Sequence, residues 1–584
     1  MESDVGQVSG RKLSRRRVLQ LSAAGMAASM LSGLLAACGG DDDDDDEDQP
    51  GDVPATSESD SESDDPETAE TDAESAPGEP KSGGTLVWGM GGDADALDPH
   101  TTNAWAAWRQ ATMMYESLVL KDLLTDEIPV PIVPQLAESW EVSDDGRTWT
   151  FALRRGVKFH DGTDFNSQAV MANYERQAVE DSPYFYPAAW HGRFSFQFAK
   201  AVEAPDDYTW VITHDQPVGE FLATMGDYYW FGIASPARME EVGTENLAAN
   251  PCGTGPFRFV ERVEGQRTEF ERNEDYWGEK PYLDRVIIRP ILEDQARVVA
   301  LQTGEIDLMS DPPPDVIESL VNEGYVFSQG LTPHVAFYRF HFRNEYGGNK
   351  LVRQAVQWAI DREAIARDLF RDTAIPAYGL LSPGAPAYDP DWKPFTYDPD
   401  RARELLAEAG YPDGFSTKLL AAPTASGWPQ AGAVAQFIKD NLAEIGIDLE
   451  LELTEWVTYL GIEFRERTDA MLWGTAWGMP TNFFLNIQAE SRYRSDSDPG
   501  DMGYSNRENP HTELDDLLIR GAQATDPEEA NELYRRANEL MCVEDAAFLA
   551  LTHDKLPHLM DPKVKGFFHS VNVNYDLTKI WLDE

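Results

Sequence analysis

Cysteine is scarce in this chain of 584 residues, and basic residues are few. Cys38, Cys252 and Cys542 match no zinc-site spacing. A disulfide between Cys252 and Cys542 is possible outside the cell, although buried free thiols are the better interpretation. Lys and Arg number 48 against 103 Asp and Glu, which gives a net charge of −55. Because neutralising phosphates needs clustered basic residues, this composition argues against a nucleic-acid partner.

Catalytic and cofactor signatures are also missing. The sequence has no G-x-S-x-G, no H-E-x-x-H and no cysteine in a catalytic cysteine–histidine signature. The glycines at 89–92 lack the spacing of a phosphate-binding loop. The ten histidines are scattered, and His214, His334 and His553 are better interpreted as structural residues. We therefore expect no cofactor, no metal site and no enzyme. A secreted hydrolase is the main alternative, but acidic residues are so common here that paired carboxylates are weak evidence for it.

The acid excess is not confined to one segment. Residues 1–80 hold 5 Lys or Arg and 21 Asp or Glu, which leaves a net charge of −39 on residues 81–584. Such a surface favours solubility, and it also suits molar salt, where the Debye length falls to about 3 Å and self-repulsion is screened. We favour the halophilic interpretation, and with it an origin in a halophilic archaeon.

The N-terminus has the pattern of an export signal. Ser14–Leu19 resembles a twin-arginine motif, the apolar run 21–37 is short and rich in small residues, and Leu35-Ala36-Ala37-Cys38 resembles a lipoprotein lipobox. We expect residues 1–38 to be a signal peptide and Cys38 to carry lipid on the extracellular face of the cytoplasmic membrane. An uncleaved anchor helix is the alternative.

Residues 39–82 are acidic, polar and free of aromatic residues, and they begin with six aspartates after Gly39-Gly40. This composition cannot bury enough apolar area to offset chain entropy, and like charges extend it. It predicts a disordered tether. Loose calcium binding by the aspartates has little support, because EF-hand spacing is absent.

From residue 83 onward the pattern alternates strands and helices. A hairpin is predicted by two alternating apolar stretches, Trp140 with Val142 and Trp149 with Phe151, on either side of a Ser-Asp-Asp-Gly turn. After it, Asn166 is a good N-cap for a helix. Further predicted elements are a strand–helix–strand passage over 286–308 with Asp294 as cap, helices at 350–370, 428–445 and 526–542, and strands at 335–342, 447–453 and 548–552. The last strand should return the chain to the first lobe, and the fold class is α/β.

Several segments resemble the signature of the family-5 solute-binding proteins, the extracellular receptors of peptide-type ABC importers. They are Leu136–Arg176, Asn250-Pro251-Cys252-Gly253-Thr254-Gly255-Pro256-Phe257, Arg272–Gly278 and the helix Arg353-Gln354-Ala355 to Ala359-Ile360-Asp361-Arg362. The resemblance extends from about Gly83 to Phe568.

The resemblance implies a two-lobed binding-protein fold with an interlobe ligand cleft and an extra subdomain in the first lobe. Lobe I would comprise 83–333 and 552–584, and lobe II 334–551, with the first crossing near 332–344. It also implies delivery of a solute, most simply a peptide, to ABC permease subunits by a monomeric receptor.

In peptide-binding members two short strands flank the ligand, and an aspartate pairs with its amino group. Transferred by motif, the strands fall at Asp93 and Ala94 and at Leu472, Trp473 and Gly474. Thr475, Ala476, Trp477 and Asn482 then complete the substrate site. The anchoring aspartate is replaced by Ala476, which should present a methyl group beside Trp477.

That departure leaves the ligand open. Asp93 or Asp95 is the alternative source of the missing carboxylate. The aromatic residues Trp473, Trp477, Phe483 and Phe484 suit either ligand stacking or core packing. A peptide is the first choice, an oligosaccharide or metal chelate the second. A structural envelope lipoprotein is the alternative of another class, beside the hydrolase.

Overall fold

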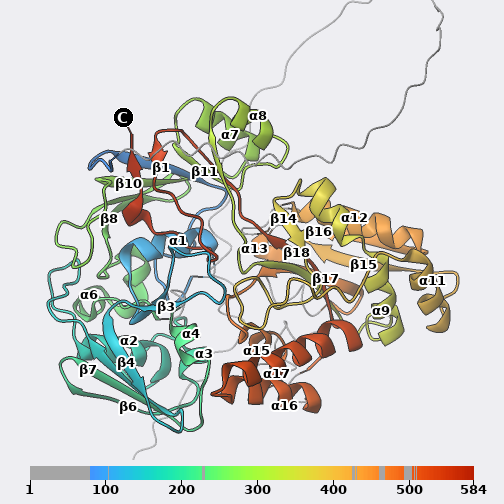
Figure 1. Ribbon diagram of the computed structural model, residues 1–584, viewed down its shortest axis with the longest axis horizontal. Helices are drawn as coiled ribbons and strands as arrows, with labels where there is room; N and C mark the ends of the chain where they lie inside the picture. The colour runs from blue at the N-terminus through green and yellow to red at the C-terminus, as the bar shows by residue number, and fades with distance from the viewer. Residues whose placement is uncertain are drawn as a thin grey trace, which may run out of the picture. The chain divides into compact units, whose positions relative to one another are not determined.

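The computed structural model describes residues 79–102, 104–226, 231–423, 428, 430–454, 456–459, 467–491, 503–505, 507 and 510–583 (Figure 1). The predicted signal, lipobox and Cys38, and all of the predicted tether except 79–82, lie outside these residues. No helix among the described residues is long and apolar enough to cross a membrane.

The first large sheet has seven strands in the order β12-β19-β11-β1-β10-β9-β8. Strand β1 runs parallel to β10 and β11, whereas β9 and β19 pair antiparallel. The strands are β1 (Thr85–Met90), β8 (Phe257–Val263), β9 (Arg267–Arg272), β10 (Arg285–Pro290), β11 (Leu308–Ser310), β12 (Val326–Ser328) and β19 (His558–Met560), and the helices beside them are α1 (Trp105–Met114), α6 (Pro236–Val242), α7 (Asp294–Gln302) and α8 (Ile317–Asn322).

The predicted strand–helix–strand passage is present as β10-α7-β11, with one correction. The N-cap residue of α7 is Glu293, and Asp294 is the first helical residue. The carboxylate of Asp294 instead accepts a hydrogen bond from Arg297 (2.6 Å). An acid in the first turn still favours the helix, because it lies near the positive end of the helix dipole.

A second sheet has six strands in the order β14-β18-β13-β17-β15-β16. Its strands are β13 (Val335–Phe340), β14 (Ala374–Pro376), β15 (Phe415–Ala421), β16 (Ile447–Leu453), β17 (Ala470–Trp477) and β18 (Phe548–Asp554). The helices α9 (Lys350–Ala359), α11 (Pro399–Glu408) and α12 (Ala431–Glu444) contribute to its apolar core, and the short helix α10 (Arg362–Ala364) follows α9. The two mixed sheets with their helices confirm the α/β fold class.

Three predicted helices differ from the structure at their ends. The 350–370 segment divides into α9, α10 and a π-helical turn at Ile365–Leu369, because Asp361 caps a new start by accepting from the Ala364 amide. Helix α12 begins at Ala431 rather than 428, and α17 (Pro527–Glu539) passes into a π-helical turn at Leu540–Glu544. Two further helices, α15 (Phe484–Ala489) and α16 (Thr512–Gln523), pack beside α17.

The four-stranded sheet β4-β5-β7-β6 forms the extra subdomain of the first lobe. Its strands are β4 (Ala137–Val142), β5 (Thr148–Leu153), β6 (Ala199–Asp206) and β7 (Thr209–His214), beside α2 (Ser167–Ala178). The predicted hairpin is confirmed with Val142 opposite Trp149, and Gly146 has the positive φ of 68° that its turn requires. The Asn166 side chain accepts from the Ala169 amide, which confirms the predicted cap.

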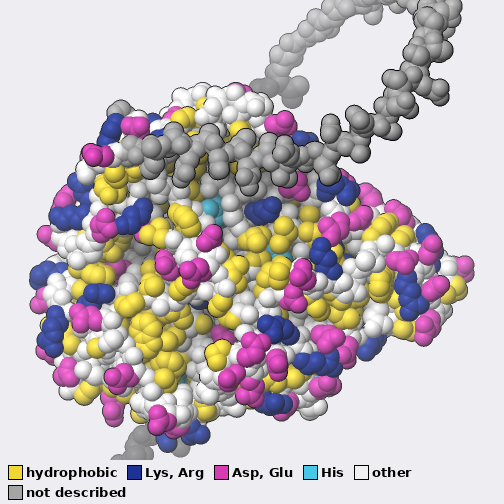
Figure 2. Space-filling view, in the orientation of Figure 1, with side chains coloured by type: hydrophobic (Ala, Val, Ile, Leu, Met, Phe, Trp, Pro, Cys, Tyr) yellow, Lys and Arg dark blue, Asp and Glu magenta, His cyan; other side chains and the backbone are white. Residues whose placement is uncertain are grey.

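Smaller elements complete the chain. They are β2 (Val119–Lys121), β3 (Ile132–Pro134), β20 (Val564–Lys565), β21 (Trp581–Leu582), α3 (Arg193–Phe196), α4 (Phe221–Met225), α13 (Trp456–Tyr459) and 3₁₀ turns at Thr244–Ala249 and Leu577–Lys579. Cys252 and Cys542 are both buried free thiols, as expected. Asp and Glu side chains are spread over the face seen in Figure 2.

Two segments connect the first and second sheets. One runs from Ser328 at the end of β12 to Val335, and the other from Asp554 at the end of β18 to His558. Hydrogen bonds join them, from the Gly330 amide to Lys555 O (3.0 Å) and from the Thr332 amide to Asp554 O (3.1 Å). The predicted strand at 548–552 therefore belongs to the second sheet throughout, and the chain returns only after Asp554.

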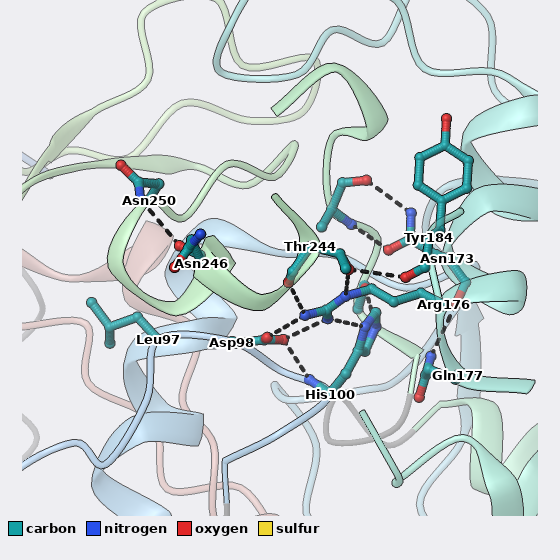
Figure 3. A network of polar contacts seen from close by, with 12 residues as sticks. Leu97, Asp98, His100, Asn173, Arg176, Gln177, Tyr184, Thr244, Asn246 and Asn250 are labelled. Atoms are coloured by element: carbon teal, nitrogen blue, oxygen red, sulfur yellow. Dashed lines mark hydrogen bonds and ion pairs between the residues drawn. The ribbon is translucent and has the colours of Figure 1, made fainter. Parts of the chain in front are cut away.

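A buried ion pair links the loop after β1 to Arg176, in one of the segments that carried the family resemblance (Figure 3). Arg176, in α2, contacts Asp98 through Nη2–Oδ2 (2.6 Å) and Nη1–Oδ1 (2.9 Å), and both side chains are almost fully buried. Arg176 also donates to Thr244 and lies 2.8 Å from His100 Nδ1. The neighbouring guanidinium lowers the pKa of Asp98 against the opposing effect of burial. The loop after β1 is thereby fixed to the subdomain.

Candidate functional site

Strand β17 carries most of the predicted site residues, and at its end the side chains of residues 476 and 477 alternate between two apolar clusters. Leu472 and Ala476 belong to a cluster with Ala336, Tyr338 and residues of α9 and α12, which we call the α12-side cluster. Trp477 packs against a cluster that contains Val335, Phe337 and Phe484, which we call the α15-side cluster.

This alternation corrects the expected position of the Ala476 side chain. Ala476 is 5% exposed and lies within the α12-side cluster, whereas the half-buried Trp477 contacts the opposite cluster. Neighbouring residues of a strand point to opposite faces. The Ala476 methyl group is therefore not presented beside the Trp477 ring.

Trp473 and Gly474 are held by internal packing. The Trp473 ring stacks on Tyr459, with centroids 5.3 Å apart and planes 5° from parallel. A Cβ added at Gly474 would lie 2.4 Å from Tyr338 Cε1 and 2.6 Å from Trp428 Cη2. The Gly474 amide donates to the Tyr459 hydroxyl (2.8 Å). Glycine is thus required here by close packing inside the second lobe.

Among the described residues, one edge of β17 has no strand partner beyond Trp473. Strand β15 pairs with β17 only as far as Trp473, while β13 pairs along the whole of Leu472–Trp477 on the other side. In the described part of the chain no strand pairs with the β15-side edge of Thr475–Trp477. An unpaired strand edge presents backbone donors and acceptors to an added extended chain.

The segment after β17 binds directly to the first lobe. Thr481 Oγ1 donates to Glu220 Oε2 (2.7 Å), Asn482 Nδ2 lies 3.5 Å from Glu220 Oε1, and Lys121 Nζ donates to Pro480 O (3.0 Å). Burial raises the pKa of Glu220, while Thr481 and the charge of Lys121 oppose that rise. We call Lys121, Glu220, Pro480, Thr481 and Asn482 the interlobe joint.

Both polar groups of the Asn482 side chain have hydrogen-bond partners around this joint. Its Oδ1 accepts from the Ala387 amide (2.9 Å), and its Nδ2 also donates to Asn531 Oδ1 (3.0 Å). The sequence interpretation missed Lys121 and Glu220, which lie more than 200 residues from their partners. An isolated Lys or Glu in this acidic chain gives no signal for such a contact.

Two tryptophans of α1 also reach the second lobe. Trp105 and Trp108 belong to the α15-side cluster together with Met479 and Phe483. Their rings lie 4.8 Å apart, and the Trp105 ring is 4.1 Å from that of His334. The available signal was a pair of tryptophans spaced i, i+3, a spacing that places two side chains on one face of a helix.

Asp93 and Ala94 lie apart from these residues. Asp93 Oδ1 accepts from the Ala94 amide (2.7 Å), and Oδ2 accepts from the Gly265 amide (2.8 Å) and pairs with Arg262 (3.3 Å). The Ala94 carbonyl accepts from Arg262. Within the described residues no bond joins Asp93 or Ala94 to 472–482. Both residues instead hold the turn between β8 and β9.

A pocket of about 280 Å³ lies in the second lobe beside β14 and β18. Tyr378, Tyr388 and Trp392 supply aromatic lining, and Lys393 and Arg535 supply positive charge. His553 also lines it and is neutral at physiological pH, because burial lowers its pKa to about 4. Asp389 also lines the pocket, and Lys393 and Arg535 are paired with Glu363 and Glu528, so the pocket suits an apolar or aromatic group. Among the described residues no three His, Cys, Asp or Glu side chains are grouped to hold a metal.

Comparison with known proteins gives a consistent result. Residues 131–495 match the family described as "Bacterial extracellular solute-binding proteins, family 5 Middle". The dipeptide-binding protein of Escherichia coli K12 is 28% identical over 503 residues, which cover 83% of this chain and 92% of the relative. Heme-binding protein A of Haemophilus influenzae is 32% identical over 461 residues, with coverage of 75% and 82%.

Solved structures with a similar fold are also solute-binding proteins of this kind. The periplasmic binding protein DppA of Helicobacter pylori, in complex with the peptide STSA, superposes with a TM-score of 0.75 at 29% identity. The superposition covers 86% of this chain and 99% of that protein. Its similarity therefore includes both lobes and the segments that cross between them.

Proposed function

Since the chain belongs to family 5 of the extracellular solute-binding proteins, we propose that it is the substrate-binding component of an ABC importer and that its ligand is a short peptide. The open edge of Thr475–Trp477 carries this proposal. A peptide in extended conformation adds to such an edge through main-chain hydrogen bonds, which any sequence can make. The dipeptide-binding relative and the peptide-bound structural relative support the same ligand class.

The proposed site uses backbone more than side chains. One wall of the proposed site consists of Leu472, Trp473, Gly474, Thr475, Ala476 and Trp477. Asn482 holds the interlobe joint behind this wall, and the Asp93–Ala94 segment is the contribution of the first lobe. Trp477 is half-buried, so its ring is the aromatic surface best placed for a ligand side chain.

Two lobes carry out capture in this proposal. Lobe I comprises 83–333 and the C-terminal return, and lobe II comprises the segment between them. The two hydrogen-bonded crossing segments act as the hinge. Closure assembles the interlobe joint, and the closed receptor then docks on the permease as a monomer. Catalysis has no part in this role.

The N-terminal segment would hold this receptor at the membrane. Export by the twin-arginine route, lipidation of Cys38 and the acidic segment 39–82 as tether are proposals that rest on sequence alone. Together they would keep the binding lobes close to the permease on the extracellular side.

Thermal shift against a solute library in molar salt tests the ligand class. A ligand that binds only the folded protein raises the unfolding temperature in proportion to RT ln(1 + [L]/Kd). We expect short peptides to give the largest shifts. A library in which only saccharides or metal chelates stabilise the protein would replace the peptide by that class, and turnover of any library member would favour the hydrolase.

A further inference from the structure

The pocket beside β14 and β18 is lined mainly by aromatic rings. Tyr378, Tyr388 and Trp392 come from the segment between β14 and α11, and His553 reaches the pocket from β18. The Tyr388 ring is 5.5 Å from that of His553, with the two planes 89° apart. A Cβ added at Gly379 would lie 2.7 Å from Trp392 Cζ3, so this glycine leaves the space that the indole occupies. The volume of about 280 Å³ is near the lower limit for ligand pockets and suits one ring system.

The charged side chains around this pocket are balanced or exposed. Lys393 Nζ lies 3.4 Å from Glu363 Oε1, and Arg535 Nη1 lies 3.1 Å from Glu528 Oε1. Asp389 is exposed to solvent, and its carboxylate repels an anion. The described lining therefore favours an uncharged ligand over an anionic one.

His553 supplies a neutral hydrogen-bond acceptor. Its Nδ1 lies 3.2 Å from His334 O, and because a carbonyl oxygen only accepts, Nδ1 carries the proton. Burial lowers the pKa of His553 to about 4, so the ring is neutral and Nε2 keeps a lone pair. Within the described residues Nε2 has no hydrogen-bond partner. A donor on a ligand would satisfy this acceptor, which costs free energy when it is buried without one.

The pocket is separate from the strand edge proposed for the peptide. In the second sheet, β18 and β13 lie between β14 and β17. Neighbouring strands are about 4.8 Å apart, so β14 lies about 14 Å from β17. The free edge of Thr475–Trp477 is on the side of β15, away from β14. The described lining residues of the pocket are also different from those of the proposed peptide wall.

Two hydrogen bonds connect the pocket to the parts that join the lobes. His334, whose carbonyl accepts from His553, lies in the first crossing segment, and its ring is 4.1 Å from that of Trp105 in α1. Ala387, which lines the pocket, donates its amide to Asn482 Oδ1 (2.9 Å) in the interlobe joint. A molecule packed against His553 and Ala387 would therefore steady groups on which the contact between the lobes depends.

We propose that this pocket is a second ligand site, which binds an uncharged aromatic molecule that carries an N–H or O–H donor. The aromatic side chains hold the ring of the ligand, and its donor meets His553 Nε2. Indole and phenol are the simplest molecules of this class. The inference goes beyond the proposed function, because the site shares no described residue with the peptide wall.

Calorimetric titration in molar salt tests the site with three probes. They are indole, 1-methylindole, which lacks the N–H donor, and indole-3-acetate, which is an anion. Trp392→Ala removes one wall of the pocket, and His553→Phe removes the acceptor. The matched control is Tyr397→Ala, because Tyr397 is an aromatic residue of the same segment that is 38% exposed and lies outside the pocket lining. Circular dichroism melting shows that each variant is folded.

We expect one indole to bind per wild-type chain and 1-methylindole to bind about tenfold more weakly, which corresponds to the loss of one neutral hydrogen bond. Indole-3-acetate should also bind more weakly than indole. Trp392→Ala should weaken indole binding at least about tenfold, because one aromatic wall is lost. His553→Phe should bind indole and 1-methylindole equally, and Tyr397→Ala should match the wild type.

Three results would overturn the inference. They are no binding of indole, indole binding that Trp392→Ala leaves unchanged, and equal binding of indole and 1-methylindole to the wild type. The comparison of the two indoles needs no variant, so it remains decisive if His553→Phe does not fold.

Titration of a free tripeptide with and without saturating indole separates this site from the proposed function. We expect indole to strengthen peptide binding, because the pocket is bonded to the crossing segment and to the interlobe joint. Indole that competes with the peptide occupies the peptide site and overturns the inference. If indole binds as expected and no peptide binds, the second site stands and the proposed function falls.

Discussion

The buried Asp98–Arg176 pair allows the most quantitative prediction. Asp98→Asn removes one charge and keeps the shape of the side chain. The guanidinium of Arg176 then remains fully buried, with only Thr244 and His100 as neutral partners. Removing one partner of a buried pair costs about 3–5 kcal/mol, because the other charge is left uncompensated. We expect a loss of unfolding free energy in that range.

A second substitution separates the pair from its surroundings. Arg176→Gln in the Asp98→Asn background removes the stranded charge, so the double variant should be more stable than Asp98→Asn alone. The coupling energy from the full cycle measures the pair itself. Asp368→Asn is the matched control, since it breaks an exposed ion pair with Arg367 of similar length and should leave stability unchanged.

Urea unfolding in molar salt, followed by tryptophan fluorescence and circular dichroism, measures these differences. Urea is preferred to guanidinium chloride, because the latter changes the ionic strength. If the two probes give separate transitions, the cost should fall on the transition of the first lobe, which contains both residues. An Asp98→Asn variant that loses less than about 1 kcal/mol would refute the reasoning.

Three further predictions follow from charge and from the N-terminus. Residues 81–584 carry a net charge of −39, so the unfolding temperature should fall as salt is diluted from molar to tenths molar, and indifference to dilution would show that the acidity serves solubility alone. The pKa of Asp554 is raised to about 8 in the folded protein. The protonated Asp554 side chain therefore stabilises the fold fully at a pH below the pKa of aspartate in the unfolded chain, and this stabilisation is lost as the pH rises to 8. Relative to Asp554→Asn, the wild type should lose up to about 1.4 kcal/mol per pH unit between about pH 5 and pH 8, and parallel stability curves would contradict this. Cys38→Ser should move the protein from the membrane fraction into precursor or medium, whereas continued lipid labelling of that variant would exclude Cys38 as the attachment site.

Local structure was predictable where a short stretch of sequence determines it. The hairpin at Val142 and Trp149 depends on alternation and one turn, and the cap at Asn166 on a side chain three residues from its donor. The α/β fold followed from the order of such elements and from the family resemblance. The same reasoning did not place β18, because a short apolar strand does not reveal which sheet it joins.

The site was less predictable, because its parts come from distant segments. Lys121 and Glu220 meet Pro480 and Thr481 across more than 250 residues, and nothing in their local sequence indicates it. The misplacement of Ala476 had a different cause. Strand periodicity alone puts residues 476 and 477 on opposite faces, whereas a motif matches residue identities and carries no information on side-chain direction.

Capture of a short peptide is the central claim, and calorimetric titration of the wild-type protein with a free tri- or tetrapeptide in molar salt tests it most directly. The account predicts saturable binding of one peptide per chain, with a heat-capacity change of negative sign as the lobes bury apolar surface around it. Absence of binding across peptides of differing length and charge, in protein shown to be folded and able to bind a saccharide or metal chelate, would contradict the claim.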